Sequence, residues 1–172
     1  VSNSEIQEGE TVAIVGSGTI GLTTMLMAQR RKPKTIYIID QSKRKLELAE
    51  KLGAIPIDFT ETDPVEYILG KTNGRGVDLA FEAVGISAGV QTTMAVTKTG
   101  GRAVWIGNSQ RMIEMDMQDV VVKAKKIIGV YSYTDDNYRN AIDFIENNLE
   151  TATIFAEEEV PLGKAEEFYT QL

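Results

Sequence analysis

Short apolar runs alternate with segments of helical period along most of the 172-residue chain. Four runs rich in β-branched and apolar residues predict strands at residues 11–15, 35–39, 77–81 and 102–106. Two weaker candidates cover residues 55–57 and 126–131. The more uniformly apolar runs suit a parallel sheet that is covered on both faces.

Between these runs, apolar residues recur at helical spacing in residues 20–29, 46–52, 65–69, 90–96 and 138–145. Helix-start residues precede three of the patterns, namely Ser42, Asp63 before a proline, and Asp135 or Asp136. Gly53 stands where a helix would end. The alternation predicts right-handed crossovers and a doubly wound, six-stranded parallel sheet, a Rossmann fold, in a single domain over residues 1–172.

The composition removes several classes of function. The chain has no Cys and no His, which excludes thiol nucleophiles, Ser/His/Asp triads and Cys/His zinc sites within it. Its net charge of −7 disfavours nucleic acid and anionic membranes as partners. No apolar stretch is long enough to span a bilayer, and the polar, acidic N-terminus does not resemble a secretory signal, so we expect a cytoplasmic protein.

A G-x-G-x-x-G pattern, Gly16 to Gly21, leaves the first predicted strand and enters the first predicted helix. Gly16 can make the sharp turn, Gly18 lets the backbone approach a pyrophosphate, and Gly21 lets the helix lie close to the sheet. The pyrophosphate would then lie at the helix N-terminus. We take this loop, Thr19 included, as a candidate dinucleotide-binding segment.

Asp40 ends the second predicted strand, 19 residues after Gly21. From there a carboxylate can accept hydrogen bonds from both adenosine ribose hydroxyls, and it would repel the 2′-phosphate of NADP, so NAD is the expected cofactor. The alternative is that the glycines form only a tight turn and Asp40 only caps a helix. The alternative cofactor is NADP, because its 2′-phosphate could be bound by the basic residues Lys43, Arg44 and Lys45.

With these residues the chain resembles the cofactor-binding domain of the medium-chain, zinc-type alcohol dehydrogenases, over nearly its whole length. The segments that carry the resemblance are residues 8–12, 16–22, Asp40, 44–46, Ala49, 52–54, 74–78, 82–85, 100–102 and 106–107. Residues 126–133 and 138–141 are most similar to the branch of the sorbitol and threonine dehydrogenases. That branch usually has Arg where this chain has Ser132, so the resemblance does not favour sorbitol as the substrate.

The resemblance implies cofactor contacts for particular residues. Ile20 would pack at the diphosphate loop, Asp40 would bind the ribose, and Lys45 would lie along the adenosine. Residues near the nicotinamide half would be Val84, Gly85, Ile106, Gly107, Asn108 and, through backbone groups, Val130, Tyr131 and Ser132. Ligands of doubly wound sheets lie beyond the carboxyl ends of the strands, which is where these residues fall.

The resemblance also implies a second domain, with Cys, His and Glu ligands for a catalytic zinc that polarises an alcohol during hydride transfer. We therefore expect this chain to bind NAD(H) and not to turn over an alcohol by itself. The small-molecule alcohol substrate stays undefined. A homo-oligomer is expected, because family members commonly pair through the edge of this domain's sheet.

The sequence leaves three other functions open. One is a non-catalytic NAD-sensing regulatory domain, another is a methyltransferase, and the third is the zinc-free quinone reductase branch with NADP. No residue is assigned a catalytic role. Glu82 is expected to be structural, and solvated surface charge is expected at Asp116, Asp119, Glu157, Glu158 and Glu159.

Overall fold

The computed structural model describes residues 1–155 and 160–170. Glu157, Glu158 and Glu159 lie outside the described residues. The chain divides into two compact units, Val1–Tyr131 (unit 1) and Ser132–Leu172 (unit 2). All strands of the sheet belong to unit 1.

Six parallel strands form one sheet in the order β3-β2-β1-β4-β5-β6. Their bounds are β1 (Thr11–Val15), β2 (Thr35–Asp40), β3 (Ile55–Asp58), β4 (Val77–Glu82), β5 (Thr97–Trp105) and β6 (Lys126–Gly129). Val15 is level with Glu82, and Glu82 is level with Trp105. The predicted doubly wound parallel sheet is confirmed, and the loops that follow these strands share one edge of it.

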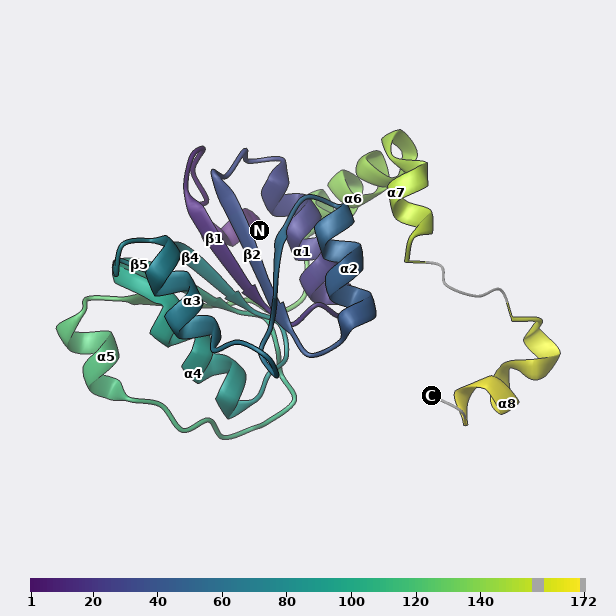
Figure 1. Cartoon of the computed structure of the whole chain (residues 1–172). Coiled ribbons are helices and arrows are strands. Elements are labelled where there is room, and N and C mark those ends of the chain that lie inside the picture. Colours follow the sequence, from purple (N-terminus) through teal and green to yellow (C-terminus); the bar gives the residue numbers. More distant parts are fainter. Residues whose placement is uncertain (156–159, 171–172) are drawn as a thin grey trace. The chain divides into compact units, whose positions relative to one another are not determined.

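The helices of unit 1 cover both faces of the sheet (Figure 1). Their bounds are α1 (Thr19–Gln29), α2 (Lys43–Lys51), α3 (Pro64–Lys71), α4 (Ser87–Val96) and α5 (Met117–Val122), after a short 3-10 turn at Ser2–Ser4. The strand order reverses direction between β3 and β4, so right-handed crossovers place α1 and α2 on one face and α3 and α4 on the other. The switch point at which doubly wound sheets bind ligands lies where the two halves of the sheet meet, between the neighbouring strands β1 and β4.

Alternate strand residues build the core beneath α3 and α4. One cluster joins β1, β2, β3 and β4 to Ile68 of α3 and Val96 of α4, and a smaller one joins Val90 and Met94 to β5. The central strands β1 and β4 are almost wholly buried, as expected for strands that are covered on both faces.

Some local expectations differ from the structure. The fifth strand begins at Thr97, five residues before the predicted start. It includes an irregularity around Gly100, which has a left-handed backbone (φ 70°), and the register with β4 shifts between Thr97 and Arg102. The sixth strand ends at Gly129. Helix α5 was missed, since its six residues are too few to establish a helical period.

Unit 2 contains α6 (Asp135–Asn147), α7 (Leu149–Thr153), a 3-10 turn (Leu162–Lys164) and α8 (Ala165–Tyr169). Helix α6 begins with a capping box formed by Thr134 and Asn137, so Thr134 takes the N-cap role that was expected of Asp135 or Asp136. Across residues 1–155 and 160–170, no helix is long and apolar enough to cross a membrane.

Candidate functional site

The glycine loop makes a tight connection from β1 to α1. Gly16 has a positive φ of 99°, and its N–H donates to the carbonyl of Ile39 at 2.8 Å. A Cβ at Gly16 would lie 2.8 Å from a methyl carbon of Val84, so the turn is also pressed against the loop that follows β4. Only glycine combines this backbone conformation with this space.

Gly18 and Gly21 differ in what surrounds them. A Cβ on Gly21 would collide with the carbonyl oxygen of Gly16, so this glycine allows the first turn of α1 to lie on the loop itself. A Cβ on Gly18 would meet nothing within 4 Å, so the loop is open to an approaching ligand there. Gly18 is also the N-cap of α1 and has no side chain to satisfy the first N–H groups of the helix. These donors and the helix dipole suit an anion such as a pyrophosphate.

Asp40 connects the end of β2 to two neighbouring segments. Its Oδ2 accepts the N–H of Ser17 at 2.6 Å, and its Oδ1 accepts the N–H groups of Gln41 at 2.8 Å and Ser42 at 3.0 Å. Burial alone would raise the pKa of Asp40, but the hydrogen bonds from Ser17, Ser42 and Gln41 together outweigh it and hold the pKa below its ordinary value. The side chain is therefore an ionised carboxylate at neutral pH.

A pocket of about 410 Å³ lies beside Asp40, at the carboxyl ends of β1, β2 and β4. Three of the candidate residues line it, namely Gly16, Asp40 and Val84. The rest of its wall is mostly apolar and comes from Val15, Ile39, Gln41, Phe59, Pro64, Ile86, Ala88, Gly89 and Thr92. An apolar slot with one carboxylate at its side has the composition of a site for a flat ring joined to a polyhydroxyl group.

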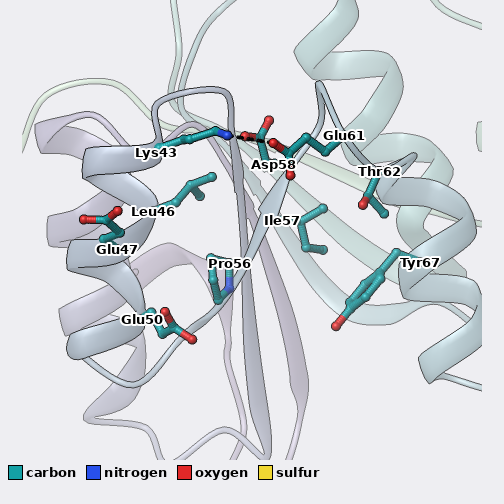
Figure 2. A pocket seen from close by; sticks show the side chains of 10 residues that line it. All are labelled: Lys43, Leu46, Glu47, Glu50, Pro56, Ile57, Asp58, Glu61, Thr62 and Tyr67. Carbon is teal, nitrogen blue, oxygen red and sulfur yellow. Dashed lines mark hydrogen bonds and ion pairs between the residues drawn. The ribbon is translucent and has the colours of Figure 1, made fainter.

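A second pocket, of about 360 Å³, lies over the edge strand β3 between α2 and Tyr67 of α3 (Figure 2). Four carboxylates line it, from Glu47, Glu50, Asp58 and Glu61. The single lysine of this pocket, Lys43, is bonded to Glu61 at 2.7 Å. A ligand with phosphate groups is disfavoured here by charge, so the pocket beside Asp40 is the better candidate of these two.

The basic cluster after Asp40 does not converge on the 410 Å³ pocket. Lys43 pairs with Glu61, and its pKa is raised by that hydrogen bond and charge. Lys45 is exposed in the first turn of α2, and neither side chain is among the residues that line the pocket.

The loops after β4 and β5 bring together four candidate residues. Gly85 is buried with a φ of 82°, and a Cβ there would overlap the backbone of Gly107 and Asn108. The N–H groups of Ile106 and Gly107 donate to the carbonyl of Glu82 at 2.9 and 3.1 Å. Candidates that lie far apart in the sequence are therefore packed against each other at the same edge of the sheet.

Glu82 also lies at this edge of the sheet, and the sequence did not indicate its contacts. Its side chain is fully buried and accepts hydrogen bonds from the backbone of Val84 and Gly85. Burial raises the pKa of Glu82, and the hydrogen bonds from Gly85 and Val84 offset this only in part. An acidic residue that directly follows the apolar residues Leu79, Ala80 and Phe81 in a central strand was the available signal.

The other candidates lie outside the 410 Å³ pocket. Ile20 is about half exposed on the first turn of α1, next to Thr19. Val130 donates its N–H to the carbonyl of Trp105 at 3.0 Å, and Tyr131 is almost fully exposed. Ser132 has a left-handed backbone (φ 62°) and is the first residue of unit 2.

Asp119 was expected to be solvated surface charge, and that expectation was wrong. Its carboxylate pairs with Lys123 at 2.6 Å and with the buried Lys125 at 2.7 Å. Asp116 is exposed, as expected, and caps α5 by accepting the N–H of Gln118.

The residues present do not fit a zinc site. Within the part of the chain that the structure describes, no group of three His, Cys, Asp or Glu side chains could hold a metal ion. The sequence has neither Cys nor His.

Comparison with known proteins agrees with this geometry. Residues 19–147 match the family model described as zinc-binding dehydrogenase. The chain is 32% identical over 150 residues to a sorbitol dehydrogenase of Bacillus subtilis, covering 86% of this chain and 42% of that protein. It is 31% identical over 157 residues to an L-threonine 3-dehydrogenase of Bacillus velezensis, covering 90% of this chain and 45% of that protein.

Among solved structures, the 2R,3R-butanediol dehydrogenase of Bacillus subtilis matches with a TM-score of 0.74 and 30% identity, over 78% of this chain and 39% of that one. The family model covers most of the chain, so the chain belongs to the zinc-binding dehydrogenase family, which is a family of oxidoreductases. It spans less than half the length of the relatives it matches. The resemblance drawn from the sequence, including its nearness to the sorbitol and threonine dehydrogenases, is confirmed.

Proposed function

We propose that this chain binds NAD(H) as the cofactor-binding part of an alcohol or polyol dehydrogenase. The observation that carries the proposal is the position of Asp40. Its ionised carboxylate lines the apolar 410 Å³ pocket and is bonded to the glycine loop through Ser17. A ribose hydroxyl pair beside Asp40 would leave the adenine in the apolar slot and direct the diphosphate toward the N-terminus of α1.

The chain's own residues would bind and orient the cofactor. Gly18 leaves open space at the helix N-terminus, and the loops after β4 and β5 would present backbone groups to the nicotinamide half. Bound nicotinamide supplies the acceptor or donor of a hydride. The protein's task in that reaction is to hold one face of the ring toward the alcohol.

NAD is proposed over NADP because a 2′-phosphate would lie against the carboxylate of Asp40. The two anions would repel each other beside a largely apolar wall. Lys43, which could have neutralised such a phosphate, is already bonded to Glu61.

A thermal-shift titration tests this assignment with four ligands: NADH, NADPH, ATP and S-adenosylmethionine. We expect NADH to raise the free energy of unfolding by about 2.7 kcal/mol at a hundred times its dissociation constant. Stabilisation by NADPH alone would support the quinone reductase reading with NADP. Stabilisation by S-adenosylmethionine alone would support a methyltransferase.

We propose further that the chain does not oxidise an alcohol by itself, and that zinc in the whole enzyme is held by residues that this chain lacks. Support comes from the absence of Cys and His and from the lack of a metal-binding group among the described residues. Steady, alcohol-dependent NADH production by the purified chain with added zinc would contradict this. If the chain binds NADH, but joining it to the rest of a dehydrogenase sequence does not give alcohol turnover, the NAD-sensing role gains support.

We also propose that copies of the chain associate through the edge strand β6. The opposite edge strand, β3, contains Pro56, which has no N–H to offer, and carboxylates flank it. Strand β6 contains no proline. Sedimentation equilibrium should give a dimer or larger species, and a monomer at every concentration would contradict the proposal.

A further inference from the structure

Glu82 has a buried carboxylate that is held by the main chain. Its Oε1 accepts the N–H groups of Val84 at 3.0 Å and Gly85 at 2.9 Å, and its Oε2 accepts that of Gly85 at 2.9 Å. Among the ion pairs of the described residues, none involves Glu82. A buried carboxylate that is satisfied by backbone donors fixes the path of the chain that supplies them.

The backbone of the same residue holds the next loop. The carbonyl of Glu82 accepts the N–H groups of Ile106 at 2.9 Å and Gly107 at 3.1 Å. Two glycines leave the space that the carboxylate occupies, because a Cβ on Gly89 would collide with Oε1 and a Cβ on Gly107 would collide with Oε2. Glu82 is therefore in contact with both loops and with α4.

The two loops also contact each other. A Cβ on Gly85 would overlap the backbone nitrogens of Asn108 and Ser109. The hydroxyl of Ser109 donates to the carbonyl of Val84 at 2.6 Å, and the N–H of Gln110 donates to the carbonyl of Gly85 at 2.7 Å. The loops after β4 and β5 thus form one packed layer above Glu82.

We propose that Glu82 is a positioning residue for the nicotinamide half of the cofactor. The inference rests on the proposed function, since residues 84–85 and 106–108 are its candidate contacts to that half. Glu82 does not itself touch the ligand. Its carboxylate and carbonyl set the two loops at the spacing at which both can meet one ring.

The substitution Glu82→Gln tests this inference in the 172-residue chain. It keeps the size of the side chain and turns one acceptor into a donor that faces the backbone N–H groups. We expect NADH to bind about tenfold more weakly, the fold-change that corresponds to losing one charge-assisted hydrogen bond. The affinity for AMP should fall less than that for NADH, because AMP lacks the nicotinamide half and meets only the side of the first loop that lines the adenine pocket. Both affinities are measured by calorimetric titration.

The matched control is Glu10→Gln. Glu10 directly precedes β1 at the opposite end of the sheet, where it pairs with Arg102 at 2.5 Å, and both side chains are largely buried. We expect the control to lower stability and leave both affinities unchanged. This separates a loss of positioning from a general loss of stability.

The outcomes distinguish the inference from the function on which it rests. If the wild-type chain does not bind NADH, the proposed function fails. If NADH binds the wild type, and Glu82→Gln leaves the NADH affinity intact or weakens NADH and AMP equally, the positioning role of Glu82 is wrong.

If Glu82→Gln does not fold, hydrogen exchange on the wild-type chain decides. NADH should slow exchange in residues 83–86 and 106–109 together, whereas AMP should slow it in residues 83–86 alone, because Val84 and Ile86 line the pocket proposed for the adenine. Protection by NADH in only one of the two segments, or in neither, would overturn the inference.

Discussion

The Oδ2 atom of Asp40 accepts the backbone N–H of Ser17 at 2.6 Å, which ties the end of β2 to the glycine loop after β1. The other carboxylate oxygen accepts the first N–H groups of the segment that leads into α2. Gln41 and Ser42 both precede Lys43, the first residue of α2, so Asp40 fixes the turn after β2 and does not cap the helix. The same carboxylate lines the pocket beside it.

The contribution of Asp40 to stability should depend on pH. Its pKa is lowered in the folded chain, so its stabilisation is complete above the pKa of the unfolded state and is lost as the pH falls through the folded value. We expect Asp40→Asn to cost about 1–3 kcal/mol in unfolding free energy at pH 7, and the difference from wild type should shrink below about pH 4. Urea unfolding at several pH values measures this. The exposed Asp136→Asn is the control, and a cost that is constant down to pH 2 would contradict the prediction.

An added methyl group should affect the stability of the chain differently at Gly18 and at Gly21. Gly18→Ala places its Cβ in open space, so the unfolding free energy should change by less than about 1 kcal/mol while NADH binding weakens. Gly21→Ala pushes a Cβ against the carbonyl of Gly16 and should cost about 2–3 kcal/mol. Thermal unfolding and NADH titration check both variants.

Gly70→Ala is the matched control for this pair. Gly70 lies within α3 with nothing near its missing Cβ, so the substitution should stabilise the chain by about 0.5–1 kcal/mol. A Gly21→Ala variant as stable as wild type would show that the close approach of α1 to the loop is not needed.

The buried ion pair between Lys125 and Asp119 should be more costly to break than to replace. The Lys125 ammonium group is buried and donates to the carbonyl of Met94 at 2.5 Å and to Asp119 at 2.7 Å. We expect Asp119→Asn to cost about 2–3 kcal/mol, because it leaves a buried cation without its counter-charge. Lys125→Met should cost less, and the double variant should recover part of the loss. Equal costs for the two single variants in urea unfolding would be inconsistent with this account.

Two helix starts provide a test of capping. The Oδ1 of Asp63 accepts the N–H groups of Val65 at 2.7 Å and Glu66 at 3.1 Å, whereas Ser42 occupies the N-cap of α2 without a side-chain hydrogen bond. Asp63→Ala should therefore cost about 1 kcal/mol, and Ser42→Ala should cost less than about 0.5 kcal/mol. Chemical denaturation measures both, and the reverse order would refute the assignment of the caps.

Strands and crossover helices were predictable because their signals are local. The run at Thr11–Val15 was predicted with the bounds that it has in the structure, since a buried parallel strand consists of consecutive apolar residues. The helix start at Asp63 and the helix end at Gly53 were predicted for the same reason. Helix α5 has a local start signal in its N-cap, Asp116, but its six residues are too few to establish a helical period.

Long-range partners were not predictable from the residues alone. Nothing near Asp119 in the sequence indicates that Lys125 is buried beside Met94, and nothing near Glu82 indicates that its carboxylate is wedged between Gly89 and Gly107. Position along the chain predicted which residues follow the strands. Their contacts with one another depend on packing that only the folded chain contains.

The contact between Gly85 and Asn108 limits how the length of this chain can vary. Inserting or deleting a residue between Glu82 and Gly85, or between Trp105 and Asn108, would move one loop past the other and break the hydrogen bonds from Ser109 to Val84 and from Gln110 to Gly85. The segment from Arg111 to Asp116 is mostly exposed, and changes of length there would be absorbed without moving either strand. Related chains should therefore differ in length after residue 110 and keep a fixed count between each of these strands and its loop.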